Sequence, residues 1–248
     1  MIRPNRRIFA IAHTRSARTR GFTLLEILIA IAIFAVLATM VYSAFNAVIS
    51  KNNAIKAGTA VFEMGKTCLS RISNDLTGLY VIRYPEYQPP DFDDPRDPYG
   101  ILAEKDFVGS TSFPELRFAS TAHLPIAGST DAGLAQIHYY VTDSEDSETG
   151  YVLKRGDTPF PYDIDEDEIE DTQNDPVLCE DVESLAFTFY DAEGNAYETW
   201  DSDAERNRYA TPRAVKIELA IKSEKAAHRF ATRVTLPVYR EKLENVRE

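Results

Sequence analysis

The most prominent pattern in the sequence is an uninterrupted apolar stretch near the N-terminus. No Asp, Glu, Lys, Arg or His occurs among the 24 residues from Ile27 to Ser50. A helix of this length would extend over about 36 Å at ~1.5 Å per residue, which is long enough to cross a bilayer. A secretory signal peptide is an alternative, but its apolar region is usually only ~7–15 residues long and precedes its cleavage site. The pattern therefore favours a membrane-spanning helix.

Beyond Lys51 the apolar residues become periodic instead of continuous. They recur at spacings of seven, three, four and three residues, at Phe62, Leu69, Ile72, Leu76 and Leu79. This spacing predicts an amphipathic helix that packs its apolar side on a globular body. Polar residues are expected on the other faces: Lys56, Lys66, Arg71 and Asp75. No proline interrupts residues 22–79, so we expect one long helix, with Gly58 and Gly65 as points where it can bend.

A loop and then a series of strands are predicted after the helix. Prolines and aspartates interleave in the loop: Pro85, Pro89, Pro90, Asp91, Asp93, Asp94, Pro95, Asp97 and Pro98. Apolar residues then alternate in six segments: 116–118, 137–141, 151–153, 185–189, 215–221 and 234–238. The turn-forming residues 191–195 separate two of these segments. Because no helix is predicted between strands, we expect an α+β fold in which the long N-terminal helix packs on a mostly antiparallel β-sheet head.

The charges divide the chain into two parts. The first 20 residues contain six arginines and no acidic residue, whereas the chain after Gly21 carries 21 basic and 39 acidic residues. Basic residues beside a membrane helix stay on the cytoplasmic side, so the acidic body should be exported. An acidic body also argues against nucleic acid as a partner.

A specific motif lies at the border between these parts. Residues 20–30 read Arg-Gly-Phe-Thr-Leu-Leu-Glu-Ile-Leu-Ile-Ala, which resembles the type IV pilin signature shared by pilins and type II secretion pseudopilins. The resemblance implies that a prepilin peptidase removes the basic leader, residues 1–21, by cutting between Gly21 and Phe22. The same enzyme would then methylate the new N-terminus of Phe22, leaving a mature chain of 227 residues, which is 248 minus 21.

Glu26 is the one acidic or basic residue between the expected cleavage site and Lys51. An unpaired carboxylate in such a segment costs roughly 2.5 kcal/mol or more. The resemblance implies that Glu26 neutralises the N-terminal amine of a neighbouring subunit during assembly. The alternative is that its carboxylate reaches the headgroup region and stays solvated.

The later sequence resembles one pseudopilin family in particular. Residues 177–191, Trp200 and residues 211–219 look like the minor pseudopilin J of type II secretion. This resemblance implies a pilin-like, lollipop-shaped protein, single-pass in the bacterial inner membrane with its head in the periplasm. Residues 22–50 would span the membrane or form the filament core, residues 51–80 would continue the helix, and residues 81–248 would form the head. The implied partners are the prepilin peptidase, the I- and K-type minor pseudopilins and the major pseudopilin.

Two further features have both a functional and an ordinary interpretation. The acidic run 163–171 offers calcium ligands at Asp163, Asp165 and Asp167, but it lacks the glycine and glutamate of a helix-loop-helix calcium loop, which favours a solvated loop. Cys68 and Cys179 are the two cysteines of the chain. They could form a disulfide in an oxidising compartment or remain buried thiols.

Catalysis and a bound cofactor are not expected. The four histidines, His13, His123, His138 and His228, are scattered and lack zinc-ligand spacing, so each is interpreted as a surface or strand residue. The leading hypothesis is a minor pseudopilin at the tip of the pseudopilus. A minor pilin of a type IV pilus or DNA-uptake system is the structural alternative, and a membrane-anchored substrate- or calcium-binding adaptor is the alternative from another class.

Overall fold

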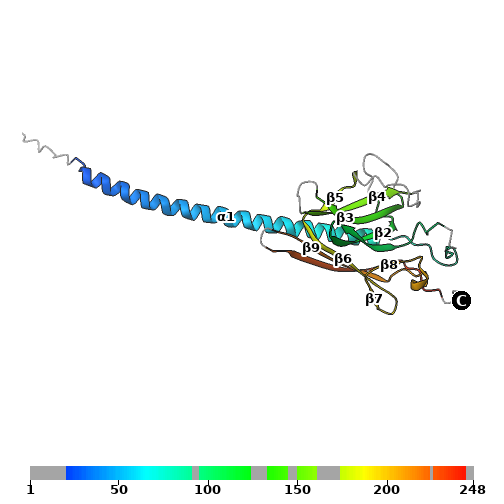
Figure 1. The fold of residues 1–248 in the computed structure, drawn as a ribbon. Helices are drawn as coiled ribbons and strands as arrows, with labels where there is room; N and C mark the ends of the chain where they lie inside the picture. The colour runs from blue at the N-terminus through cyan, green and yellow to red at the C-terminus, as the bar shows by residue number, and fades with distance from the viewer. Residues whose placement is uncertain are drawn as a thin grey trace, which may run out of the picture. The chain divides into compact units, whose positions relative to one another are not determined.

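The computed structural model describes residues 21–90, 95–123, 133–144, 150–160, 174–223 and 226–243. The chain forms two compact units, Met1–Ala54 and Ile55–Glu248. Helix α1, Leu24–Thr77, contributes its apolar N-terminal part to the first unit and its amphipathic part to the second. The two sheets belong to the second unit (Figure 1). The predicted α+β fold with an antiparallel head is therefore confirmed.

One sheet of the head has six strands in the order β5-β4-β3-β2-β1-β8. Their bounds are β1 Leu102–Val108, β2 Thr111–Ser120, β3 Ala135–Asp143, β4 Tyr151–Pro159, β5 Val177–Cys179 and β8 Trp200–Asp201. Every neighbouring pair is antiparallel. Strands β1 to β4 lie side by side in chain order, so short connections suffice.

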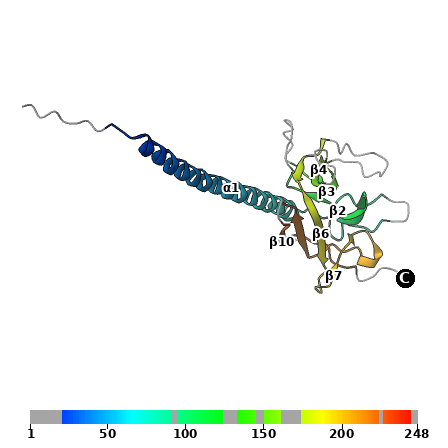
Figure 2. The same cartoon turned by 60° about the vertical axis from the view of Figure 1, so that its left-hand side comes forward.

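The second sheet has four strands in the order β10-β9-β6-β7. Their bounds are β6 Val182–Tyr190, β7 Ala196–Tyr197, β9 Ala214–Ile221 and β10 His228–Thr235. A short 3₁₀ helix, Glu205–Asn207, precedes β9. These pairs are also antiparallel, and Figure 2 shows β6, β7 and β10 on one side of the head.

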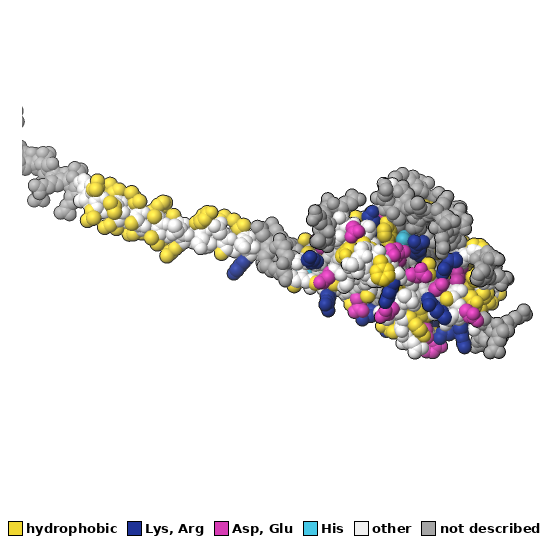
Figure 3. Space-filling view, viewed as in Figure 1, with side chains coloured by type: hydrophobic (Ala, Val, Ile, Leu, Met, Phe, Trp, Pro, Cys, Tyr) yellow, Lys and Arg dark blue, Asp and Glu magenta, His cyan; other side chains and the backbone are white. Residues whose placement is uncertain are grey.

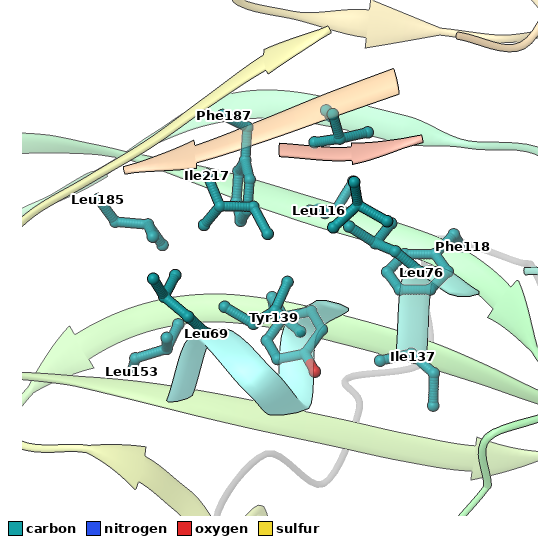
Figure 4. Close-up of a cluster of buried hydrophobic side chains, with 14 of the residues drawn as sticks. Leu69, Leu76, Leu116, Phe118, Ile137, Tyr139, Leu153, Leu185, Phe187 and Ile217 are labelled. Atoms are coloured by element: carbon teal, nitrogen blue, oxygen red, sulfur yellow. The ribbon is translucent and has the colours of Figure 1, made fainter. Parts of the chain in front are cut away.

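The core of the head joins the second half of α1 to both sheets (Figure 4). Leu69 and Leu76 come from the helix, and Tyr139 and Phe187 come from the two sheets. The predicted apolar stripe of the helix is confirmed at four positions, which are buried: Leu69, Ile72, Leu76 and Leu79. The helix is therefore part of the hydrophobic core of the head.

Two expectations about the helix were wrong in detail. Phe62 is 56% exposed, because it lies at the margin of the head, where its ring is 5.8 Å from that of Phe230. The helix ends at Thr77, and Leu79 instead pairs with Ser120 as an isolated bridge. A glycine at position 78 favours this exit, because glycine is a weak helix former.

The last strand lies earlier than its apolar pattern predicted. Strand β10 ends at Thr235, so Leu236 and Val238 of the predicted strand 234–238 lie beyond it. Pro237 has no N–H with which to continue a ladder, and this explains the end of the strand.

Strand β1 was not predicted from the sequence. Four consecutive exposed residues in Leu102–Val108 conceal its alternation.

The predicted turn at residues 191–195 is confirmed and is centred on Asp191. Its carboxylate accepts hydrogen bonds from the backbone N–H groups of Glu193 and Asn195 and from the Asn195 side chain, at 3.0, 2.8 and 2.9 Å. Lys242 also donates to it, at 3.2 Å. Gly194 has φ +89°, a left-handed conformation that suits glycine. Burial alone would raise the pKa of Asp191, but the hydrogen bonds from Asn195 and Lys242 outweigh it and hold the pKa below its usual value.

This lowered pKa predicts how the stability of the head depends on pH. A carboxyl whose pKa is depressed in the folded state stabilises the fold above its unfolded pKa, here 3.8, and loses that contribution as pH falls through the folded pKa. Asp191→Asn should therefore lower the free energy of unfolding by about 1–2 kcal/mol at pH 7. The variant should also lose stability less steeply than wild type below pH 3.8. Denaturant unfolding at several pH values measures both, and Asp143→Asn, at an exposed position, is the control.

Candidate functional site

The helix start contains the residues of the predicted processing motif. Thr23 directly precedes α1, and its Oγ1 accepts a hydrogen bond from the Glu26 N–H at 3.2 Å. In return, Glu26 Oε2 accepts hydrogen bonds from the Thr23 N–H and the Thr23 hydroxyl, both at 3.2 Å. This reciprocal pair is a capping box, which satisfies N–H groups that a helix start leaves free. Glu26 therefore has a local partner, Thr23, in addition to the roles expected from the sequence.

Gly21 and Phe22 lie outside the helix, just before this cap. Both are exposed, and Phe22 is 84% exposed. A Cβ built on Gly21 would meet no atom within 4 Å. The predicted scissile bond thus lies in exposed backbone outside the helix. A protease requires such accessible, non-helical backbone.

The apolar stretch forms a helix with no buried side chains. Leu24–Lys51 is a 28-residue candidate span with mean hydropathy 2.7, and none of its most apolar window is buried in the protein. Figure 3 shows apolar side chains along this part of α1, whereas charged side chains gather on the head unit. Such a surface needs lipid or other helices around it, because large exposed apolar patches are rare on soluble monomers.

The structure brings the two cysteines together. Cys68 lies in α1 and Cys179 ends β5, and their Cα atoms are 6.3 Å apart. Both side chains are buried, with 0% and 1% exposure. A Cα separation of about 4.4–6.8 Å suits a disulfide, so this geometry supports a bridge between the helix and an edge strand.

Because the charge pattern predicts export of the head, we expect a Cys68–Cys179 bridge there, since oxidising compartments favour disulfides. Non-reducing mass spectrometry should detect the linked peptides. The double variant Cys68→Ser/Cys179→Ser should unfold with a free energy about 2–4 kcal/mol lower than that of wild type. Under reducing conditions this difference should shrink, since wild type would then also lack the bridge. Two free thiols in the native exported chain would refute the expectation.

A buried ionic cluster connects the helix to the six-stranded sheet. Asp75 was predicted on a polar face, and this was wrong, because its side chain is fully buried. Asp75 Oδ2 accepts hydrogen bonds from the Tyr139 hydroxyl at 2.5 Å and from Arg155 Nε at 2.7 Å. Arg71 Nη2 lies 2.7 Å from Asp75 Oδ1 as an ion pair. Asp75 follows Ile72 by three residues, which places it beside the buried stripe of the helix, but the sequence does not show the distant partners that compensate its charge.

The cluster continues along β4. Arg155 Nη1 donates to Asp157 Oδ2 at 2.6 Å, and Asp157 Oδ1 lies 2.5 Å from His123 Nδ1. The interpretation of His123 as a surface or strand residue was therefore wrong, since its side chain is 5% exposed and it follows β2.

Burial and, to a smaller extent, the charge of Asp75 raise the pKa of Tyr139, so its hydroxyl stays protonated and donates. Two arginines, Arg71 and Arg155, thus lie beside the two aspartates of the cluster.

Arg240 organises a second buried cluster in the head. Its guanidinium donates to the carbonyls of Tyr209 and Ser202 at 2.6 and 2.8 Å and to Asp97 Oδ2 at 2.7 Å. It also lies over the ring of Tyr87, 3.3 Å from the centroid. These contacts attach the segment after β10 to the proline-rich loop, so the cluster has a structural explanation.

The remaining predicted sites fall into two groups. The calcium candidates Asp163, Asp165 and Asp167 and the leader residue His13 lie outside the described residues. His138 lies on β3 beside Glu115, and the hydrogen bond from His138 lowers the pKa of Glu115. His228 begins β10. Among the described residues, no group of three or more His, Cys, Asp or Glu side chains is placed to hold a metal ion.

The chain has an apolar helix that begins at a Gly-Phe-Thr motif and continues into the core of an antiparallel head. Pilin-like proteins have this arrangement. Comparison with protein families agrees, because the prokaryotic N-terminal methylation motif matches residues 16–42. The family of type II secretion system protein J matches residues 43–232, which is most of the chain. The chain belongs to this family. A search of curated proteins finds no match.

Proposed function

We propose that this chain is a minor pseudopilin that helps to assemble the tip of the periplasmic pseudopilus for protein export across the outer membrane. The match to protein J over residues 43–232 is the observation that carries the proposal. Members of this family are structural rather than catalytic.

In this proposal the chain has four functional parts. Residues 1–21 are the leader that prepilin peptidase removes, and Phe22 becomes the methylated N-terminus. Residues 22–50 hold the precursor in the inner membrane and later enter the filament. Residues 51–80 and 81–248 form the amphipathic helix continuation and the periplasmic head. The exposed, non-helical backbone at Gly21 and Phe22 and the exposed apolar part of the helix support this division.

The proposed partners are the I- and K-type minor pseudopilins and the major pseudopilin. The test is co-purification of the full-length chain with each of them from detergent-solubilised membranes. A complex with the I- and K-type subunits at micromolar concentration is the expected result. Failure to bind either one would contradict the tip assignment while leaving the pilin-like processing of the chain intact.

A further inference from the structure

Strand β10 forms a long edge of the four-stranded sheet. It pairs with β9 over its whole length, His228 to Thr235, in a continuous register. Among the described residues no strand pairs with its other side, and Figure 2 shows it beside α1. Proteins usually protect such an edge, because its free N–H and C=O groups can pair with another chain.

The register identifies which backbone groups are free. Leu236 N–H donates to the Arg213 carbonyl at 2.9 Å, one step beyond the pair formed by Thr235 and Ala214. In an antiparallel ladder, residues alternate between bonding the neighbouring strand and pointing away from it. The backbone groups that point away from β9 are therefore those of Arg229, Ala231, Arg233 and Thr235.

A hollow lies beside this edge, between β10 and α1. It has a volume of about 300 Å³, and its lining includes Phe62, Lys66 and Ser70 of the helix and Phe230 and Ala231 of the strand. Phe62 is 56% exposed at its margin. The hollow offers space and apolar contact for side chains of a strand added next to β10.

The edge is basic, although the chain as a whole has a net charge of −12. Arg229 and Arg233 are exposed on β10, and the strand contains no acidic residue. Lys66 lines the adjacent hollow. We propose that the β10 edge binds an extended, acidic segment of a neighbouring pseudopilin subunit by strand addition, with its side chains in the hollow. This rests on the proposed function, which supplies such neighbours.

The charges also decide against a second copy of this chain as the occupant. Two β10 edges paired antiparallel about Ala231 would bring Arg229 of each copy opposite Arg233 of the other. Like charges directly opposite each other destabilise a strand pair. An acidic segment would meet no such repulsion and could pair with Arg229, whereas the Arg233 guanidinium already lies over the ring of Tyr190, 3.9 Å from its centroid. A different subunit therefore fits this edge better.

Two substitutions at Ala231 separate backbone pairing from side-chain effects. Ala231→Pro removes an N–H that points away from β9, so the ladder to β9 should survive while the added strand loses a donor. Ala231→Val keeps the N–H and is the matched control. A third variant, Arg229→Glu, reverses one charge of the edge without changing the backbone.

Binding should be measured with the full-length processed chain in detergent against each purified pseudopilin of the same secretion system. Ala231→Pro and Arg229→Glu should weaken one of these complexes at least about tenfold, equivalent to ~1.4 kcal/mol. Ala231→Val should bind as wild type, and thermal unfolding should confirm that the variants are folded. If Ala231→Pro does not fold, Arg229→Glu decides alone.

The outcomes distinguish this inference from the proposed function. If wild type binds its partners and neither Ala231→Pro nor Arg229→Glu weakens any complex, the edge is not the interface and the pseudopilin assignment is unaffected. If wild type binds none of the pseudopilins, both proposals fail. If the edge variants disrupt self-association of wild type instead, the occupant is a second copy and the proposal of an acidic neighbour is wrong.

Discussion

Asp75→Ala is expected to lower the free energy of unfolding of the head by about 3–5 kcal/mol, because removing one partner of a buried ion pair leaves the other charge uncompensated. Arg155 would lose its 2.7 Å hydrogen bond, and the Tyr139 hydroxyl would lose its acceptor. Burial by itself would lower the pKa of Arg155, but the hydrogen bonds to Asp75 and Asp157 raise it. In the variant the contribution of Asp75 is lost, but an arginine guanidinium stays protonated in proteins, so Arg155 cannot avoid this cost by losing its proton.

The change is large relative to the ~5–15 kcal/mol stability of a typical domain. The single tryptophan of the chain, Trp200, is buried, so its fluorescence reports unfolding in denaturant. Glu63→Ala is the matched control, since Glu63 is an exposed acid on the same helix. Equal destabilisation by the two substitutions would show that the buried cluster does not hold the helix on the sheet.

Glu26→Ala is expected to leave cleavage intact while reducing incorporation into pseudopilus complexes. Removing a buried charge partner typically costs about 3–5 kcal/mol, which corresponds to a loss of roughly a hundredfold or more. The measurement compares, by quantitative immunoblotting, how much processed chain enters cross-linked complexes with other pseudopilins. Uncleaved precursor accumulating in the Glu26→Ala strain would place the role of Glu26 in processing instead.

The capping box makes a sharper version of this experiment available. Glu26→Gln removes the charge but can retain the hydrogen bond to the Thr23 N–H, because glutamine also forms capping boxes. Thr23→Ala removes the cap and keeps the charge. If Glu26 pairs with the amine of a neighbouring subunit, Gln should fail like Ala, and Thr23→Ala should assemble. The opposite result would mean that Glu26 acts as a helix cap.

The elements with the strongest patterns could be predicted from the sequence. The uninterrupted apolar stretch predicted the N-terminal helix, and the stripe through Leu69, Ile72 and Leu76 predicted its place in the core. Alternation of residue types predicted β3, β6 and β9, although only β6 alternates clearly between buried and exposed positions in the structure. These patterns are local, and a single sequence is enough to detect them.

Features that depend on distant residues were not predicted. Asp75 was taken for a surface residue because its partners Tyr139 and Arg155 are 64 and 80 positions away. The approach of Cys68 to Cys179 spans 111 positions and could be stated only as one of two alternatives. Strand β1 was not predicted because exposed charged residues interrupt its alternation. It forms by pairing with β2. Long-range pairing determined each of these features.

The central claim is that this chain is a pilin-like precursor that is processed between Gly21 and Phe22. The most direct test is intact-mass and N-terminal peptide analysis of the full-length chain after co-expression with a prepilin peptidase. We predict a 227-residue product, 248 minus 21, that begins with methylated Phe22. An uncleaved chain, or one cut after the apolar stretch that ends at Ser50, would contradict the claim.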